Sequence, residues 1–311
     1  MTKIIVVAGP TASGKTSVGI KIAKAVGGEI ISADSMQVYK DMPVATACPT
    51  KEEQSQVPHH LVEIIDRNEK FSVAVWCRLA EEKIKEITAR GNIPVIVGGT
   101  GLFIDSLVDH IKFEDVGVDE NLRNSLMEKD TDTLYSELLK LDPQSAKGIH
   151  KNNKKRVVRA LELYYSGVSK TEQNVNSRKE SSPYEVLYFV LGYNDRQKLY
   201  NRINKRVDMM LSLGLKEEAA RCLESSSGTS AQAIGHKELI PYFNGECSLE
   251  DALENLKKET RHYAKRQITW FKRRDDAVFL MLDENRNQAV ETAVNMCEDF
   301  INGKFTGRKS E

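Results

Sequence analysis

Apolar residues in the first hundred positions form short unbroken runs that alternate with longer amphipathic stretches. Residues 4–8 and 93–97 are continuous β-branched and apolar runs, as is typical of strands buried on both faces. Residues 29–32 predict a further short strand. Apolar side chains recur at helical spacing in residues 16–26 and 73–89, which predicts two amphipathic helices. Strands that alternate with helices in this way indicate a parallel α/β sheet flanked by helices.

The pattern changes after about residue 112. Residues 115–167 are polar, charged and helical in periodicity, whereas a strand-like apolar run returns at 185–191. Residues 195–276 are mainly helical in pattern, and 277–282 predict a last strand. A helical insertion between strands of one sheet explains this order better than two consecutive domains. We therefore predict three segments: a first part of the core at 1–114, an inserted all-helical subdomain at 115–184, and the remainder of the core with basic C-terminal helices at 185–311.

Composition is that of an ordinary globular chain, with 40% hydrophobic and 29% charged residues and a formal net charge of zero. The apolar runs are too short to cross a bilayer, and no signal-peptide pattern precedes the first strand, so we expect a cytoplasmic protein without a membrane partner. The five cysteines form no C-x-x-C pair, which argues against a disulfide framework or a zinc site. Residues 147–159 and 261–274 are locally basic and suited to bind phosphates.

The turn after the first strand carries the segment Gly-Pro-Thr-Ala-Ser-Gly-Lys-Thr at residues 9–16, which matches the phosphate-loop pattern G-x-x-x-x-G-K-[ST]. Glycines let the backbone curl so that its N–H groups converge on an anion, and the helix N-terminus adds partial positive charge. Lys15 supplies a full charge, and the Thr16 hydroxyl is suited to hold Mg²⁺ against phosphate oxygens. The segment therefore predicts a diphosphate site on a P-loop NTPase-like core.

The phosphate loop alone does not identify the owner of the diphosphate. A nucleotide kinase or NTPase usually carries a second, metal-associated carboxylate at a strand end. The strand at 93–97 ends instead in Gly-Gly-Thr-Gly, and Asp66 is only a weak substitute. This absence weighs against an ordinary nucleotide kinase or NTPase and leaves the owner of the diphosphate open.

Three segments together carry a resemblance to a known family: the phosphate loop, Ser-Ala-Asp-Ser-Met-Gln at residues 32–37, and Gly-Gly-Thr-Gly-Leu at 98–102. Further pieces follow in the expected order: His-His-Leu at 59–61, Arg-Val-Val-Arg at 156–159, Arg-Ile-Asn-Lys-Arg at 202–206, Gln-Ala-Ile-Gly at 232–235 and the basic aromatic segment at 260–271. The chain resembles the bacterial tRNA dimethylallyltransferases (MiaA family) over nearly its whole length.

The resemblance implies transfer of a dimethylallyl group from dimethylallyl diphosphate to N6 of the adenosine 3′-adjacent to the anticodon in tRNA. It implies that Asp34 takes the proton from the amine, and that Thr100 and Lys15 complete the catalytic set. The diphosphate would be bound by a wider set, with Mg²⁺ on Thr16: Gly9, Thr11, Ala12, Ser13, Gly14, Lys15, Thr16, Arg202 and Arg206.

The same resemblance implies an RNA-binding surface that receives the anticodon stem-loop, with the target base flipped out of its stack. Its residues would be Asp34, Ser35, Met36, Gln37, Lys155, Arg156, Arg159, Gly235, His236, Arg266 and Gln267. No obligatory protein partner is implied. The aromatic residues among the cations of 261–274 would suit stacking together with phosphate contact.

Three departures from the family pattern fall on the inferred RNA side. Cys48 stands where the family commonly has lysine, His236 where it usually has tyrosine, and Lys155 where glutamine is usual. These departures put individual contacts with RNA in doubt. They affect the predicted reaction less, because none of them lies in the phosphate loop.

Plainer alternatives remain open at this stage. Asp34 could cap a following helix, Arg156 and Arg159 could be a solvated helix face, and Trp270 and Phe271 suit a core better than a stacking platform. The rival enzymes are a small-molecule P-loop kinase and an isopentenyltransferase acting on free adenine nucleotides. The non-enzymatic rival is an RNA-binding P-loop module, against which the intact Lys15, Thr16 and Asp34 argue.

Overall fold

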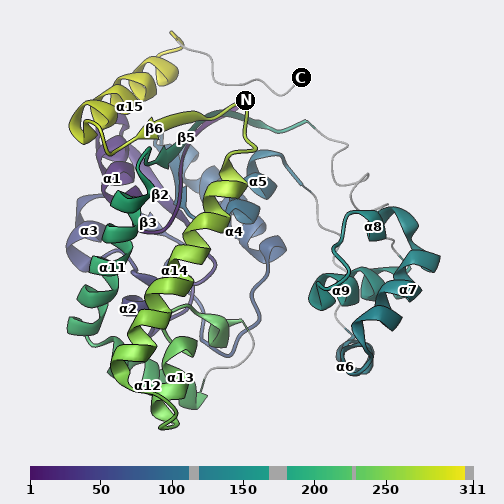
Figure 1. The fold of residues 1–311 in the computed structure, drawn as a ribbon. Helices are drawn as coiled ribbons and strands as arrows, with labels where there is room; N and C mark the ends of the chain where they lie inside the picture. Colours follow the sequence, from purple (N-terminus) through teal and green to yellow (C-terminus); the bar gives the residue numbers. More distant parts are fainter. Residues whose placement is uncertain (112–118, 168–180, 226–228, 305–311) are drawn as a thin grey trace. The chain divides into compact units, whose positions relative to one another are not determined.

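The computed structural model describes residues 1–111, 119–167, 181–225 and 229–304 (Figure 1). They form two compact units, one made of residues 1–108 and 182–311 and the other of 109–181. The larger unit holds the sheet, and the smaller unit contains only helices among its described residues. The predicted fold class, an α/β core with an inserted helical subdomain, is confirmed. None of the described helices is long and apolar enough to cross a membrane.

A six-stranded sheet forms the centre of the larger unit, in the order β3-β2-β4-β1-β5-β6 with every neighbouring pair parallel. The strands are β1 (Thr2–Ala8), β2 (Gly28–Ala33), β3 (His59–His60), β4 (Ile93–Gly98), β5 (Tyr184–Gly192) and β6 (Val278–Met281). The long apolar runs became the inner strands, as expected of strands covered on both faces. The two-residue β3 was not predicted, because neither of its residues is apolar.

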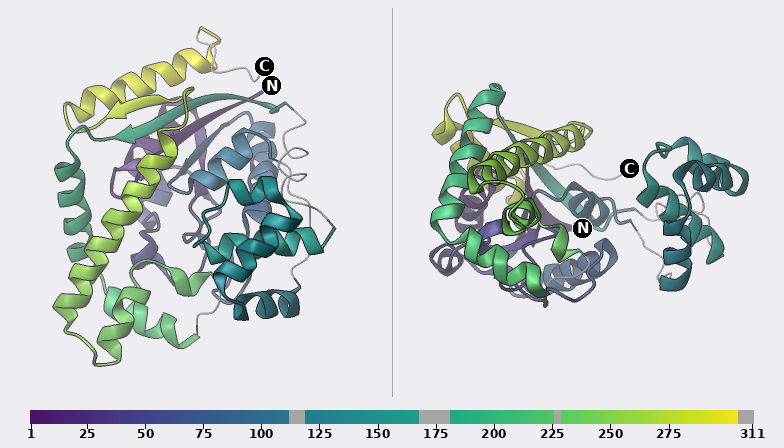
Figure 2. Two further views of the ribbon diagram at one scale, coloured as in Figure 1. Left: turned by 45° about the vertical axis from the view of Figure 1, so that its right-hand side comes forward. Right: turned by 60° about the horizontal axis from the view of Figure 1, so that its bottom comes forward.

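Helices cover both faces of this sheet (Figures 1 and 2). The helices of the larger unit are α1 (Lys15–Val26), α2 (Pro43–Thr46), α3 (Lys51–Gln56), α4 (Val73–Ala89), α5 (Gly101–Val108), α11 (Arg196–Ser212), α12 (Leu215–Ser225), α13 (Ile240–Phe243), α14 (Leu249–Phe271) and α15 (Arg286–Ile301), with short 3₁₀ turns at Ser230–Gln232 and Lys237–Leu239. On one face, α1 and α15 pack against alternate residues of the strands, which include Ile5, Val95 and Phe189. The other face is covered by α4 and α5.

The boundaries of α4 coincide with the predicted helix at 73–89. Ser72 caps its N-terminus by accepting a hydrogen bond from the N–H of Val75. Its buried face includes Trp76, whose indole N–H donates to the carbonyl oxygen of Ser32 at 2.9 Å. The helix is thereby fixed to the end of β2, immediately before Asp34.

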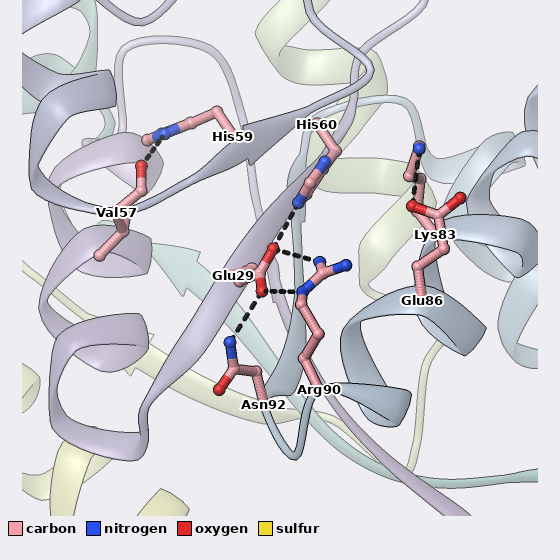
Figure 3. Close-up of polar contacts among 8 residues, drawn as sticks. All are labelled: Glu29, Val57, His59, His60, Lys83, Glu86, Arg90 and Asn92. Atoms are coloured by element: carbon pink, nitrogen blue, oxygen red, sulfur yellow. Dashed lines mark hydrogen bonds and ion pairs between the residues drawn. The ribbon is translucent and has the colours of Figure 1, made fainter.

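A buried carboxylate, Glu29, joins β2 to the segments beside it (Figure 3). It accepts hydrogen bonds from His60 on β3 (2.6 Å), from Arg90 (3.1 and 2.8 Å) and from Asn92 (2.8 Å). Burial alone would raise the pKa of Glu29, but these bonds outweigh it and lower the pKa to about 2. The neighbouring His59 turns away and contacts the Val57 carbonyl instead. Glu29 therefore stays ionised at neutral pH and ties β3 to the sheet at the end remote from the phosphate loop.

The smaller unit contains α6 (Glu120–Glu128), α7 (Thr131–Leu141), α8 (Pro143–Lys147) and α9 (Lys154–Tyr165), within the helical stretch predicted from its sequence. Leucines and valines of these helices form its own core. Ion pairs also hold these helices together. The buried Glu162 of α9 accepts hydrogen bonds from Arg123 of α6 at 2.6 and 3.0 Å and from Arg159 at 3.1 Å. The unit can therefore hold its helices together without the sheet.

Candidate functional site

Three segments singled out in the sequence meet at one edge of the sheet. Ala8 and Ala33 are both paired with Gly98 in the parallel register, so β1, β2 and β4 end side by side. The phosphate loop, Asp34 and Thr100 follow those three strand ends. The carboxyl edge of a parallel sheet is where ligands bind in open α/β folds. The topology therefore brings the predicted catalytic residues together.

The phosphate loop has the backbone shape that an anion cradle requires. Gly9 and Gly14 adopt φ values of +146° and +95°, which favour glycine, and Ala12 lies in the left-handed region at +61°. Among the described residues no side chain caps the N-terminus of α1. The N–H groups of its first turn therefore lack intrahelical partners and point toward the loop, where an anion would accept from them.

Two cations and one carboxylate act on one another beside this loop. Burial, and then the charge of Arg206, lower the pKa of Lys15 to about 8, although the charge of Asp34 opposes both. Burial likewise lowers the pKa of Arg206, again against the charge of Asp34. Lys15 Nζ donates to the Pro10 carbonyl oxygen at 2.8 Å. Arg206, which comes from α11, therefore belongs to the same charged crevice as Lys15 and Asp34.

One of the two carboxylate oxygens of Asp34 is hydrogen-bonded to the backbone that follows it. Its Oδ1 accepts from the N–H of Met36 at 2.9 Å and of Gln37 at 3.4 Å, so the carboxylate does cap the turn that follows. Its Oδ2 makes no hydrogen bond with any described residue. One oxygen therefore fixes the orientation of the side chain, and the other remains able to accept a proton.

Thr100 and Tyr263 complete the crevice. Thr100 Oγ1 accepts from the N–H of Ser35 at 3.1 Å, and Tyr263 of α14 lies where the charge of Asp34 acts on it. Burial and then the charge of Asp34 raise the pKa of Tyr263, so its phenol is neutral at physiological pH. The ring also lies under the guanidinium of Arg266, at 5.7 Å from the ring centroid. Tyr263 was expected to stack with RNA, and its position beside the charge of Asp34 was not foreseen.

The glycines after β4 allow α14 to approach this crevice. A Cβ atom on Gly99 would lie 2.3 Å from Gln267 Nε2, and one on Gly101 would lie 2.2 Å from the Trp270 ring. Gln267 is buried, its Oε1 accepts from the N–H of Thr11 at 2.8 Å, and its Nε2 donates to the Gly99 carbonyl at 2.8 Å. One side chain of α14 thus joins the phosphate loop to the turn that carries Thr100.

The residues after Asp34 form part of the crevice wall. Ser35, Met36 and Gln37 are all half-buried. Gln37 accepts from Ser32 Oγ at 2.9 Å and donates to the carbonyls of Thr46 and Ala47, so its amide is already engaged within the protein. Its present contacts order the segment that leads to α2.

The remaining predicted residues of the larger unit lie in different settings. Arg202 is exposed and donates from Nε to the Ala12 carbonyl at 2.8 Å, on the outer side of the phosphate loop. His236 is buried and pairs with Glu218 at 2.8 Å, so a direct contact of its side chain with RNA would require that pair to open. Gly235 adopts φ +114° and a Cβ atom there would meet Ala45.

The predicted RNA contacts of the smaller unit lie on α9. Lys155 and Arg156 are exposed near its N-terminus, whereas Arg159 is half-buried and pairs with Glu162. Arg159 therefore stabilises the unit, and the two exposed cations are available for phosphate contacts.

A divalent cation fits one part of the site. The described residues contain no group of three or more His, Cys, Asp or Glu side chains that could hold a metal ion by themselves. Mg²⁺, however, is commonly held by one or two protein ligands together with phosphate oxygens and water. Thr16, half-buried in the first turn of α1, supplies a hydroxyl of this kind. Asp66, the weak alternative, is exposed and pairs with Lys40.

Family models match most of the chain. The model described as IPP transferase matches residues 37–274, and the model described as isopentenyl transferase matches residues 2–66. Among curated proteins, the chain is 43% identical to a tRNA dimethylallyltransferase of Caldanaerobacter subterraneus subsp. tengcongensis, with 97% of this chain and 98% of the relative covered. It is 44% identical to a tRNA dimethylallyltransferase of Anoxybacillus flavithermus, with 97% of both chains covered.

Solved structures agree with these relatives. The fold is similar to a full-length tRNA isopentenylpyrophosphate transferase of Bacillus halodurans, with a TM-score of 0.74, 38% identity and 98% of both chains covered. It is also similar to a eukaryotic dimethylallyltransferase described as acting on tRNA, with a TM-score of 0.83 and 30% identity over 100% of this chain and 82% of the other. The suspected resemblance is confirmed by these matches.

Proposed function

The chain belongs to the family of tRNA dimethylallyltransferases, and we propose from that membership how its residues perform the reaction. The enzyme transfers a dimethylallyl group from dimethylallyl diphosphate to an adenosine of tRNA. In the proposed step, the bond between the allylic carbon and the diphosphate oxygen breaks, and a bond from the adenine N6 to that carbon forms. The N6 proton passes to Asp34, and diphosphate leaves.

The leaving diphosphate lies in the phosphate loop, where the first N–H groups of α1 converge. Lys15 and Arg206 supply the charge that stabilises it, and burial, which lowers the pKa of both, strengthens their attraction for an anion. Mg²⁺ held by the Thr16 hydroxyl would neutralise further oxygens of the diphosphate. Gly9, Thr11, Ala12, Ser13 and Gly14 shape the cradle.

The attacking amine lies on the other side of the reacting carbon, next to Asp34. The carboxylate is oriented through Oδ1 and receives the proton on Oδ2. Thr100 lies in the same crevice and holds the Ser35 backbone beside it. The observation that carries the proposal is that β1, β2 and β4 end side by side, so that the phosphate loop, Asp34 and Thr100 follow at one edge of the sheet. It indicates one crevice that can hold base and leaving group together.

The acceptor we propose is the adenosine 3′-adjacent to the anticodon, presented by the anticodon stem-loop. That base must leave its stack to reach Asp34. Ser35 and Met36, which follow Asp34, and Arg266, which lies over the Tyr263 ring, would contact the flipped nucleotide. Lys155 and Arg156 would bind backbone phosphates from the smaller unit.

Radiolabelled dimethylallyl diphosphate tests the proposal directly. It is incubated with unmodified tRNA, with an anticodon stem-loop, with the same stem-loop carrying guanosine at the target position, and with AMP. Label is expected in tRNA and in the first stem-loop only. Label in AMP but not in tRNA would contradict the acceptor, and equal label in both stem-loops would contradict the position.

Gln267 offers a second test, because it joins the two loops that hold donor and acceptor. Gln267→Leu leaves the Thr11 N–H and the Gly99 carbonyl unpaired, and each unpaired buried group costs about 1–3 kcal/mol. We expect kcat for transfer to fall roughly ten- to hundredfold, since 1.36 kcal/mol corresponds to about tenfold. The KM for dimethylallyl diphosphate should rise as well.

The matched control is Gln288→Leu, the same change at an exposed position on α15. Steady-state kinetics separate the two possible roles of Gln267, with tRNA varied at saturating dimethylallyl diphosphate and the donor varied at saturating tRNA. If Gln267 were only an RNA contact, the KM for tRNA alone would rise and kcat would stay at the wild-type value.

A further inference from the structure

A basic pocket lies behind the phosphate loop. Its volume is about 330 Å³, at the lower end of the range of about 300–1,000 Å³ usual for small-ligand sites. Its lining comes from the end of β5, from α11, and from the segment that joins β6 to α15. The lining residues are Tyr193, Lys198, Asn201, Arg202, Lys205, Leu282, Asp283 and Arg286.

Three side chains of the lining donate hydrogen bonds to the phosphate loop or to the first turn of α1. A loop that turns its N–H groups toward an anion turns carbonyl groups outward. Arg202 donates to the carbonyl of Ala12 at 2.8 Å, and the Tyr193 hydroxyl donates to that of Ser13 at 3.4 Å. Arg286 donates to Ser17 Oγ at 2.6 Å. The pocket therefore adjoins the phosphate loop.

The pocket lining carries more cationic than anionic side chains. Lys198, Arg202 and Lys205 lie three or four residues apart on α11 and so share one face of the helix. Asp283 is the one acidic residue in the lining, and its two oxygens accept from the N–H groups of Asn194 (3.0 Å) and Asp195 (2.9 Å).

The four lining cations thus remain largely available to a ligand. Lys198 donates to the main-chain carbonyl of Asp283 at 3.1 Å, and Lys205 makes no hydrogen bond or ion pair with any described residue. Arg202 uses one nitrogen on the loop and lies over the Tyr193 ring at 5.9 Å, and Arg286 uses one nitrogen on Ser17 of α1. Their other N–H groups can form charge-assisted hydrogen bonds to phosphate oxygens.

We infer that this pocket is a second anion site, which binds a diphosphate group outside the catalytic cradle. The inference rests on the proposed function, because that reaction consumes one diphosphate ester and releases free diphosphate. A compact polyanion fits the combination of small volume and dense charge better than an extended RNA backbone. Arg202 lines the pocket and also donates to the Ala12 carbonyl of the phosphate loop, so the second site adjoins the catalytic cradle.

The test counts diphosphate bound to the full chain by equilibrium dialysis with labelled inorganic diphosphate and Mg²⁺. Wild type is compared with Lys15→Met, which weakens the cradle, and with the double variant Lys198→Ala/Lys205→Ala, which weakens the pocket. The matched control is Lys21→Ala/Lys85→Ala, which removes two exposed lysines that do not line the pocket. Thermal melting checks that each variant is folded.

Wild type and the lysine control should bind two diphosphates per chain. The double variant should lose the weaker site, with affinity reduced tenfold or more and the transfer rate at saturating donor unchanged. Lys15→Met should retain the weaker site. Added salt should weaken that site strongly, since its lysines are exposed.

Three results would overturn the inference. Wild type could bind one diphosphate that Lys15→Met abolishes, which leaves the proposed function intact. The double variant and the lysine control could lose the same binding, which would indicate non-specific surface charge. Unmodified tRNA could displace the retained diphosphate from Lys15→Met at equimolar concentration, which would identify the ligand as an RNA phosphate. Absence of any diphosphate binding by wild type would count against the proposed function itself.

Discussion

Asp34→Asn is expected to lower the rate of dimethylallyl transfer to tRNA by about 10²- to 10⁴-fold, the range that general base catalysis contributes. Asparagine keeps an acceptor oxygen for the N–H groups of Met36 and Gln37, so the turn should survive. It cannot take up the proton from the adenine amine. The rate is measured by single-turnover transfer with saturating tRNA.

Diphosphate affinity should separate loss of the base from loss of the site. The charge of Asp34 attracts Lys15 and Arg206 and would repel a diphosphate, so its removal should leave binding of inorganic diphosphate unchanged or tighter. The matched control is Asp41→Asn in the same loop. Asp41 is exposed and has φ +61°, a conformation that asparagine tolerates well. Transfer by Asp34→Asn at the wild-type rate would show that another group is the base.

Much of this site was predictable because its parts are local in sequence. The phosphate loop combines a buried strand, a glycine turn and a helix start within about fifteen residues, and such patterns have few other uses. Asp34 and Thr100 could be placed beside it because parallel strands end at a common edge. Apolar periodicity alone located the boundaries of α4 and the inner strands.

Contacts across long sequence separations were not predictable in the same way. Gln267 lies 256 residues from Thr11, and nothing in its local pattern indicates that its amide reaches the phosphate loop. The family resemblance implied an RNA contact for Gln267. Its amide is buried and bonded within the protein, and the RNA contact stays a prediction. Glu29 could not be recognised as a buried anchor, because Arg90 and Asn92 meet it only once α4 packs against the sheet.

His236 shows a related difficulty. A histidine after Gly235 in a loop has the composition of a surface contact. The structure instead buries it against Glu218, whose two oxygens also accept from the N–H groups of Val44 and Ala45. The pairing depends on α12 packing against α2, a tertiary contact without a signal in either segment.

Lys15→Met is expected to reduce kcat/KM for dimethylallyl diphosphate by about 10²- to 10³-fold, the loss seen when one preorganised stabiliser of a developing anion is removed. Methionine has a similar length and leaves the backbone of the loop intact. The lost charge would otherwise act in a partly desolvated site, together with Arg206, on the departing diphosphate. Steady-state kinetics with saturating tRNA measure the effect, and Lys21→Met on the exposed face of α1 is the control.

The pH dependence of diphosphate binding tests the same lysine in another way. The pKa of Lys15 is lowered to about 8, so its ammonium group loses its proton as the pH rises through that value, and the attraction for diphosphate is lost above it. Diphosphate itself also titrates in alkaline solution, so the quantity to compare is the ratio of wild-type to Lys15→Met affinity at each pH. We expect this ratio to be large and constant below about pH 8 and to fall above it. A ratio that stays constant well above that pH would show that Lys15 keeps an ordinary pKa, and a ratio near one throughout would show that Lys15 does not hold the diphosphate.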